Sequence, residues 1–388
     1  MLDYEIQVLI AYLEFTIIAE WRRGYRLVML RNRNEPKQVP SKQVRLDSLK
    51  YVKSTHSSKE KQITLDLVKE SFGDVDEAYE DYYNWTYLQN PLGTGTVLFV
   101  YDQDKPVAQL GSIPCSYWFM NKCVPVTLAI DVCVTPEYRG NGILVELMRR
   151  IHAFNDSVPF SLSVPSAPSI GGHIRSDYKL LPMSVIVRPL MISSYFRNIG
   201  IKTVLKPIDR LLKKNGDVRV REHVDRFDET FDDLAIATCA PNTIRQMRSS
   251  QFLNWRYKAN PRRRYKVFAA ARDGILYGYI ITRLIKFENR EIGYIVDFVA
   301  RENAAGKSLV SAALQDFWAN NVVYSRAACF PNCLEYDIFR ETGFFPLPSR
   351  VRSQPSMLCV KTFNDNLYQE GIVDINKWFF MLGDNDSH

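Results

Sequence analysis

The segment 135–143, Thr-Pro-Glu-Tyr-Arg-Gly-Asn-Gly-Ile, has the residue types of an anion-binding loop. An apolar run precedes it, and apolar residues at helical spacing follow from Ile143 to Phe154. Gly140 and Gly142 allow the backbone to approach a ligand closely, and a helix N-terminus offers N–H groups that have no partner within the helix. We therefore expect this loop to bind a phosphate group, although it lacks the G-x-G-x-x-G and Walker patterns.

The same segment resembles the signature of the GNAT superfamily of acyl-CoA-dependent N-acyltransferases, in which R/Q-x-x-G-x-G/A opens a helix that cradles the pyrophosphate of coenzyme A. Residues 139–142 match R-x-x-G, residues 134–138 match the usual lead-in, and Leu144 replaces the final small residue. The resemblance covers about residues 63–190 and implies acetyl-CoA or another acyl-CoA as substrate. It also implies cofactor-binding residues on the strand end and the loop: Val132, Cys133, Val134, Arg139, Gly140, Asn141, Gly142 and Ile143.

Acyl transfer to an amine needs a neutral nucleophile, donors for the oxyanion and, optionally, an acid for the departing thiolate. In this fold the backbone N–H groups around residues 132–134 are the expected oxyanion donors. Asp131 is the first candidate for a general base or an amine-orienting carboxylate, although the recurrence of its counterpart Asp297 also fits a structural role. His173 is the second catalytic candidate, because it stands where the family often carries the Tyr that protonates the thiolate. Tyr178 is a substitute for it.

The surrounding sequence predicts the elements that position this loop. Short apolar runs at residues 97–101, 107–113 and 124–130, separated by turn residues, predict the strands of an antiparallel meander. A further strand over residues 132–134 leads into the loop, and residues 143–154 predict an amphipathic helix. The loop is therefore expected at the junction of a strand and a helix.

The sequence repeats itself, since N-W-x-Y-x-x-N-P at residues 84–91 recurs at residues 254–261. We interpret the repeated aromatic cluster as a packing device, because Trp and Tyr bury large areas. The second copy has Ala305 to Ser308 in place of the R-x-x-G loop. The predicted fold is α/β, with two tandem GNAT-like domains, each a mostly antiparallel mixed sheet flanked by helices. The predicted limits are an N-terminal helix and basic connector at 1–62, an acyl-CoA domain at 63–200, a linker at 201–222 and a degenerate second domain at 223–388.

Composition narrows the function class. The net charge of +7 over 388 residues is small and dispersed, so nucleic acid is not an expected partner. Seven cysteines without a C-x-x-C pair indicate reduced, mostly buried thiols in a cytoplasmic protein with no metal site, and Cys133 is expected to be such a thiol rather than a nucleophile. Residues 4–19 predict a one-faced apolar helix too short to span a bilayer. We expect this helix either to pack against the rest of the same chain or to contact a partner subunit or a membrane surface.

We therefore expect an enzyme that moves an acetyl or other short acyl group from coenzyme A to a small-molecule amine. The resemblance to tandem acyltransferases of polysaccharide modification favours an amino sugar or a surface-polysaccharide precursor as acceptor. An amino acid, a polyamine, an antibiotic or a protein lysine remains open. The alternatives are an aminoacyl-tRNA-dependent transferase of similar fold and an inactive CoA-binding or partner-binding protein.

Overall fold

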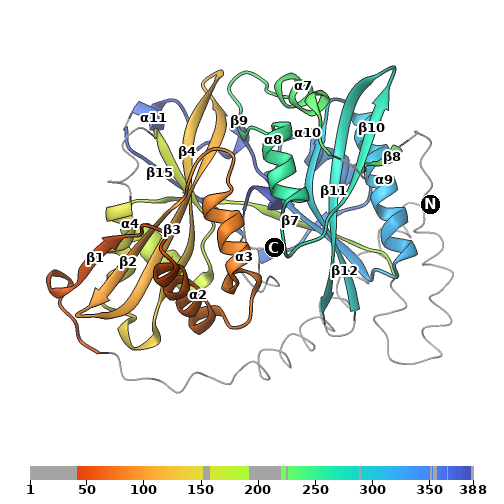
Figure 1. Ribbon diagram of the computed structural model, residues 1–388. Coiled ribbons are helices and arrows are strands. Elements are labelled where there is room, and N and C mark those ends of the chain that lie inside the picture. Colours follow the sequence, from red (N-terminus) through yellow and green to blue (C-terminus); the bar gives the residue numbers. More distant parts are fainter. Residues whose placement is uncertain are drawn as a thin grey trace.

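The computed structural model describes residues 42–151, 158–191, 220–223, 226–287, 290–349, 352, 356–364 and 366–385, which form two neighbouring sheets with helices against them (Figure 1). The first sheet contains β1 (Lys50–Lys53), β2 (Thr96–Asp102), β3 (Lys105–Phe119), β4 (Lys122–Val134), β5 (Phe160–Ser163), β15 (Met357–Thr362), β6 (Lys179–Pro182), β9 (Ile244–Gln246) and β16 (Trp378–Phe379). The second contains β14 (Phe345–Pro346), β7 (Ser184–Pro189), β13 (Tyr324–Cys329), β12 (Arg290–Ala300), β11 (Ile275–Phe287), β10 (Lys266–Arg272) and β8 (Val220–His223). Most neighbouring strands are antiparallel, so the fold is a mixed α/β fold with mostly antiparallel sheets.

The helices of the described residues are α2 (Ser58–Phe72), α3 (Glu80–Tyr83), α4 (Ile143–Arg150), α5 (Ile170–Arg175), α7 (Glu229–Ala237), α8 (Ser250–Leu253), α9 (Asn303–Ala319), α10 (Leu334–Glu341) and α11 (Asn366–Gln369). The amphipathic α4 buries Ile143, Leu147 and Met148 in a small core with residues of β3 and β4, while Arg149 and Arg150 face solvent. A much larger core runs continuously through both sheets. None of the helices described is long and apolar enough to cross a membrane.

The two sheets exchange a strand. In the first sheet β15 lies between β5 and β6, with Cys359 opposite Ser163 and Leu358 opposite Leu181. In the second sheet β7 occupies the matching place between β13 and β14. Figure 1 shows the late-sequence β15 in the half that contains β1 to β4. The limits 63–200 and 223–388 stay a prediction, but each sheet takes an inner strand from the other range.

The repeated tryptophans meet where the two halves touch. Trp85 and Trp255 each lie in a π-helical turn, Asn84–Leu88 and Asn254–Lys258. Their rings stack with centroids 4.8 Å apart and planes 18° apart. Each indole Nε1 donates a hydrogen bond to the other residue's backbone oxygen, at 2.8 and 3.0 Å. The packing interpretation of the repeated motif is therefore confirmed.

The sequence predictions of local structure succeed in the sheet and fail at the connector. The three meander strands are present as β2, β3 and β4, and the predicted short strand 132–134 is the continuation of β4. Residues 50–53, expected in a solvated connector, form β1 and pair with β2. Residues 58–62 begin α2, whose Ser57 and Glu60 form a capping box. The predicted helix at residues 4–19 lies outside the described residues.

Candidate active site

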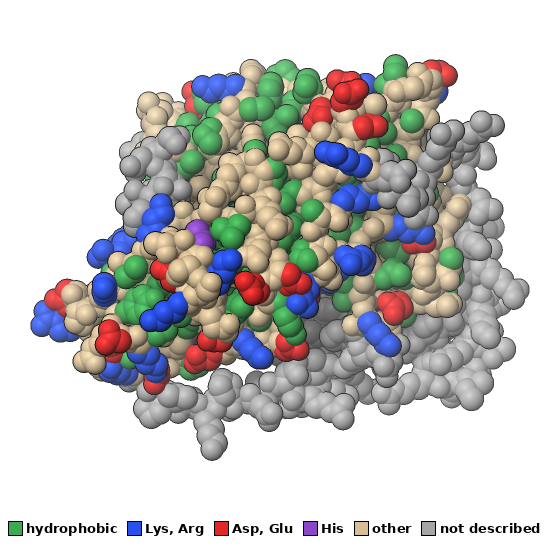
Figure 2. All heavy atoms as spheres, viewed as in Figure 1, with side chains coloured by type: hydrophobic (Ala, Val, Ile, Leu, Met, Phe, Trp, Pro, Cys, Tyr) green, Lys and Arg blue, Asp and Glu red, His purple; other side chains and the backbone are tan. Residues whose placement is uncertain are grey.

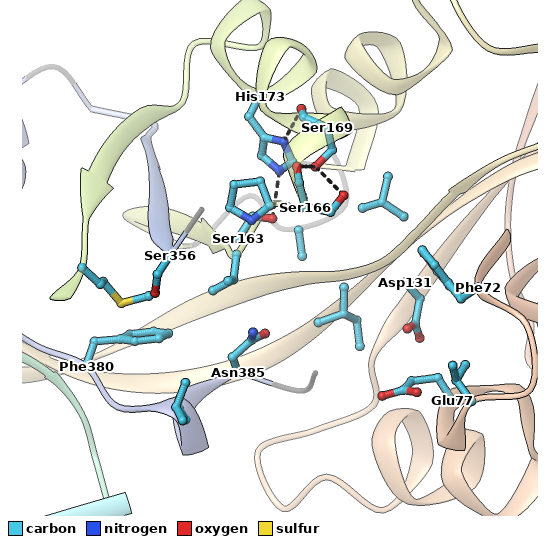
Figure 3. Close-up of a pocket in the computed structure, with 18 of the residues that line it drawn as sticks. Phe72, Glu77, Asp131, Ser163, Ser166, Ser169, His173, Ser356, Phe380 and Asn385 are labelled. Carbon is cyan, nitrogen blue, oxygen red and sulfur yellow. Dashed lines mark hydrogen bonds between the residues drawn. The ribbon is translucent and has the colours of Figure 1, made fainter. Parts of the chain in front are cut away.

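Two parallel strands of the first sheet separate and leave a cavity between them. β4 and β5 pair from Thr127 opposite Ser161 to Ala129 opposite Ser163. β5 ends there, whereas β4 continues to Val134. A cavity of about 600 Å³ opens beyond this fork, lined by both strands and by residues of the second half (Figure 3). The edge of β4 after Ala129 therefore faces the cavity, and its backbone groups are placed to bind an extended ligand.

The loop after β4 has the backbone geometry of a phosphate cradle. Gly140 and Gly142 adopt φ values of 86° and 82°, a left-handed conformation that glycine adopts without strain. A Cβ added at Gly140 would meet no atom within 4 Å, so the space beside the loop is open. Gly142 is the N-cap of α4 and makes no side-chain capping bond, which leaves the first amides of the helix available to an anion.

Neighbouring residues hold this loop in place. The Asn141 amide accepts a hydrogen bond from the Val44 N–H at 3.2 Å and donates one to the Lys42 carbonyl at 2.8 Å. Leu144, the departure from the expected small residue, packs against α5. A Cβ on Gly172 would lie 2.2 Å from the Leu144 Cδ2 atom, so a glycine in α5 provides the room for this leucine. The departure is therefore accommodated without closing the cradle.

His173 lies on one wall of the cavity and contacts Ser163 at the fork. Its Nδ1 lies 2.9 Å from the Ser169 carbonyl, which can only accept a hydrogen bond, so Nδ1 carries the proton. In the neutral ring Nε2 then accepts a hydrogen bond from the Ser163 Oγ, also at 2.9 Å. Burial lowers the pKa of His173 and outweighs the opposing effect of the Ser169 carbonyl. The neutral imidazole is thus the resting form, and His173 and Ser163 both line the cavity (Figure 3).

Asp131 and Glu77 are separated from His173 by the cavity and lie close to each other in Figure 3. Asp131 has a left-handed backbone with a φ of 48°, beside a bulge in the β3–β4 pairing. Its carboxylate accepts a hydrogen bond from the Tyr87 hydroxyl at 2.6 Å. Glu77 is ion-paired with Arg263. The cavity therefore has an acidic wall, opposite the imidazole.

The structure brings only part of the predicted set into this cavity. Asp131, Val132 and His173 line it. Tyr178 does not: its ring packs on the edge of His173 and its hydroxyl lies 3.4 Å from the Ser161 Oγ in the core. Cys133 is a buried thiol whose pKa is raised by burial, which disfavours the nucleophilic thiolate. All seven cysteines are free thiols.

The sequence analysis did not identify Ser163 as a site residue. In the sequence it is only the last residue of the short strand Phe160–Ser163. Its importance depends on its contact with a helix seven residues further on. In the described part of the chain no three His, Cys, Asp or Glu side chains cluster in a way that would hold a metal ion.

The matching region of the second half, residues 300–308, forms no such loop. β12 ends at Ala300 and α9 begins at Asn303, so residues 305–308 already lie within the helix. Gly306 is packed tightly, since a Cβ there would lie 2.3 Å from the Ile338 Cδ1. Lys307 forms an ion pair with Glu341 at 2.6 Å. This region is built as a packed helix and offers no cradle.

Comparison with known proteins agrees with this geometry. Residues 53–181 match the family model for an acetyltransferase (GNAT) domain. A GCN5-related N-acetyltransferase from Anabaena variabilis superposes with a TM-score of 0.59 at 15% identity, over 81% of this chain and 73% of that chain. A GCN5-related N-acetyltransferase from Kribbella flavida gives a TM-score of 0.53 at 15% identity, over 82% and 72%. No curated protein sequence matches the chain.

The fold also matches that of Saccharomyces cerevisiae N-myristoyltransferase with bound myristoyl-CoA and inhibitors, with a TM-score of 0.53 at 14% identity over 84% of this chain and 82% of that chain. GNAT acyltransferases use acetyl-CoA or another acyl-CoA as substrate. The domain match and the shared fold support an acyl-CoA-dependent N-acyltransferase.

Proposed function

We propose that this chain, which carries a GNAT acetyltransferase domain at residues 53–181, transfers an acetyl or other short acyl group from coenzyme A to a small-molecule amine. The observation that carries the proposal is the β4–β5 fork, which opens into the cavity, on the strand that continues into the glycine loop at the start of α4. The loop would bind the pyrophosphate, and the β4 edge would bind the pantetheine arm. The acyl carbonyl would then lie at the fork.

Residues 132–134 remain the proposed oxyanion donors, because β4 continues past its last pair with β5. The amine nitrogen attacks the thioester carbon, so that a C–N bond forms and the C–S bond breaks. One proton passes from the amine to the Ser163 Oγ while the Ser163 proton moves to Nε2 of His173. The same relay runs in reverse to deliver that proton to the leaving thiolate. His173 can begin as a base in this scheme because burial keeps it neutral.

Asp131 is proposed to orient the acceptor amine by accepting hydrogen bonds or by pairing with its ammonium form. We propose further that the two halves arose by tandem duplication, on the shared strand order and the repeated motif. The cytoplasm is the proposed location, because free thiols persist there. An amino sugar stays in the panel of acceptors to be tested.

The glycine loop and the charge pattern of one face favour this proposal over a tRNA-dependent transferase. On the face shown in Figure 2, basic and acidic side chains are intermixed. A transferase that binds tRNA would need a basic stripe to neutralise phosphates. Such an enzyme would also not need a pyrophosphate cradle. The intact R-x-x-G loop therefore points to coenzyme A.

A thermal-shift experiment tests the donor site. CoA and acetyl-CoA are expected to raise the melting temperature, with a stabilisation of about 2.7 kcal/mol at a hundredfold excess over Kd. Gly142→Asp places a carboxylate in the cradle and should abolish this shift. Gly142→Asn is the matched control, since Asn tolerates the same left-handed backbone without the charge. Lys307→Ala tests the other half, and it should keep the full shift. A full shift with Gly142→Asp, or its loss with Lys307→Ala, would show that the site is misplaced.

Rate measurements test the proton path. His173→Gln should lower the rate at neutral pH by about 10²–10⁴-fold while the CoA-induced shift is kept. Ser163→Ala should lower it as well, because the relay loses its middle member. With Asp131→Asn, part of the lost rate should return as pH rises and more of the amine is neutral. Wild-type rates in His173→Gln at every pH would exclude the relay. Myristoyl-CoA belongs in the donor panel because the yeast neighbour binds it.

A further inference from the structure

An arginine of the second sheet lines the same cavity as the proposed reaction site. Arg326 lies on β13, directly opposite Tyr294 of β12 in the parallel pairing, and both residues line the cavity. The guanidinium carbon is 5.7 Å from the centre of the Tyr294 ring. Its Nε is buried and makes no hydrogen bond within the described structure. No carboxylate of the described residues pairs with it.

A second guanidinium increases the positive potential at this end of the cavity. The Arg352 Nε donates to the Leu347 carbonyl at 2.8 Å, and its Nη1 donates to the Met183 carbonyl at 3.0 Å. Burial lowers the pKa of Arg352, and the charge of Arg326 lowers it further. The two arginines are therefore close enough to repel each other.

The other buried arginines are satisfied in one of two ways. Arg188, Arg245 and Arg256 donate to backbone carbonyls, and two others pair with acids. Arg248 binds Asp297 and Asp384, and Arg263 binds Asp76 and Glu77. A guanidinium taken partly out of water without such a partner lowers stability. Arg326 lines a ligand-sized cavity, so an anionic group of a bound ligand could supply the missing partner.

Charged groups of both signs line this largely apolar cavity. They are the carboxylates of Asp131 and Glu77 and the guanidinium of Arg326. A ligand that matches both kinds of charge has an amino group and an anionic group. A planar guanidinium is suited to bind a carboxylate or a phosphate through two parallel hydrogen bonds.

We infer that Arg326 binds an anionic group, a carboxylate or a phosphate, on the amine acceptor, with Arg352 reinforcing the field. This inference rests on the proposed function, because it treats the cavity as the acceptor site. It narrows the acceptors to amines that also carry a negative charge, and it makes Arg326 a specificity-determining residue of the second half.

Matched acceptor pairs test the inference. Phenylalanine and phenethylamine differ by a carboxylate, and glucosamine 6-phosphate and glucosamine differ by a phosphate. With acetyl-CoA, the wild-type protein should show kcat/KM at least about tenfold higher for the charged member of one pair, and the pair that responds identifies the anion. Arg326→Gln should remove this preference, and Arg326→Lys should keep part of it. Arg272→Gln, at an exposed arginine of the β10–β11 hairpin, is the control and should change nothing.

A binding arm keeps the inference separate from catalysis. Without any CoA, the charged member of the responding pair should raise the melting temperature of the wild-type protein and not that of Arg326→Gln. The CoA-induced shift should be equal in both proteins. Equal treatment of charged and uncharged amines by the wild-type protein overturns the inference. Loss of the CoA shift in Arg326→Gln also overturns it, because the bound anion would then belong to coenzyme A. Failure of the proposed function shows differently, as absent turnover together with an absent CoA shift.

Discussion

Asp131 and Asp297 occupy matching places in the two halves but have different surroundings. Each accepts a hydrogen bond from the tyrosine of the repeated motif, from Tyr87 at 2.6 Å and from Tyr257 at 3.1 Å. Asp297 is fully buried and also binds the Arg248 Nε at 3.0 Å. Asp131 lines the cavity. The shared Tyr–Asp hydrogen bond therefore serves the fold in both halves, whereas Asp131 also lines the cavity and Asp297 is enclosed in the core.

The chain itself fills the second fork. β12 and β13 pair only as far as Tyr294 opposite Arg326, after which β12 continues to Ala300. The C-terminal turn at Leu382–Asp384 packs against both strands. The Arg248 Nη2 holds Asp384 at 2.7 Å. A Cβ on Gly383 would lie 1.9 Å from the Tyr257 hydroxyl, so a glycine is needed for this close approach. A fork that opens into a cavity in one half is thus a packed core in the other.

The largest expected effect comes from separating the halves. Because β15 and β7 are inner strands of the opposite sheets, a chain ending at residue 200 lacks a strand between β5 and β6. Such a chain should fail to give a cooperative unfolding transition, since the gap exposes two unpaired strand edges. Co-expression with residues 201–388 should restore it if the halves find each other. Independent cooperative folding of both pieces, by circular dichroism and urea titration, would contradict the strand exchange.

Charge removal should separate the two aspartate sites next. Arg248→Met leaves Asp297 and Asp384 buried without their cation and should cost about 3–5 kcal/mol of unfolding free energy. Asp131→Asn keeps an acceptor for Tyr87 and should cost roughly 1 kcal/mol or less. Urea unfolding measures both variants. Equal losses of unfolding free energy would mean that Asp131 stabilises the fold as much as Asp297 does.

The pH dependence of stability should reveal the contribution of the buried His173. Its folded-state pKa is lowered by burial, so below the ordinary histidine value of about 6.5 the unfolded chain binds more protons than the folded one. The contribution of His173 is therefore complete at neutral pH and is lost as pH falls through that value. His173→Gln should flatten the melting temperature between about pH 7 and pH 5. An unchanged profile would show that another group controls acid stability.

The tryptophan pair should give a modest effect that is symmetric between the two halves. Trp85→Phe and Trp255→Phe each remove one indole donor to the opposite backbone oxygen, at a cost of about 1 kcal/mol plus lost packing. The two losses should be similar, and the double variant should show coupling because the rings are in contact. Urea unfolding of the three variants checks this. Strongly unequal losses of unfolding free energy in the two single variants would mean that one tryptophan stabilises the contact more than the other.

Local signals account for what was predicted correctly. The strands β2 to β4, the glycine loop and α4 depend on turn residues and apolar spacing within a few positions, and these are visible along the chain. The Asp131 candidate followed from its place on the strand before the loop, and the His173 candidate from its match to a position where the family often has a Tyr. Both residues line the cavity. The connector prediction failed because β1 is short and gains its stability from pairing with β2.

The sequence by itself determined that a strand, a phosphate-type loop and a helix occur in order, and that an aromatic motif is repeated. Only the tertiary structure decided which strands neighbour each other, where the chain end packs, and that Ser163 meets His173 while Arg326 meets no acid among the described residues. The physical reason is the range of the interactions. Turn preference and helix spacing act between near neighbours, whereas strand exchange, fork filling and charge compensation depend on residues far apart in the chain, which only the folded state brings together.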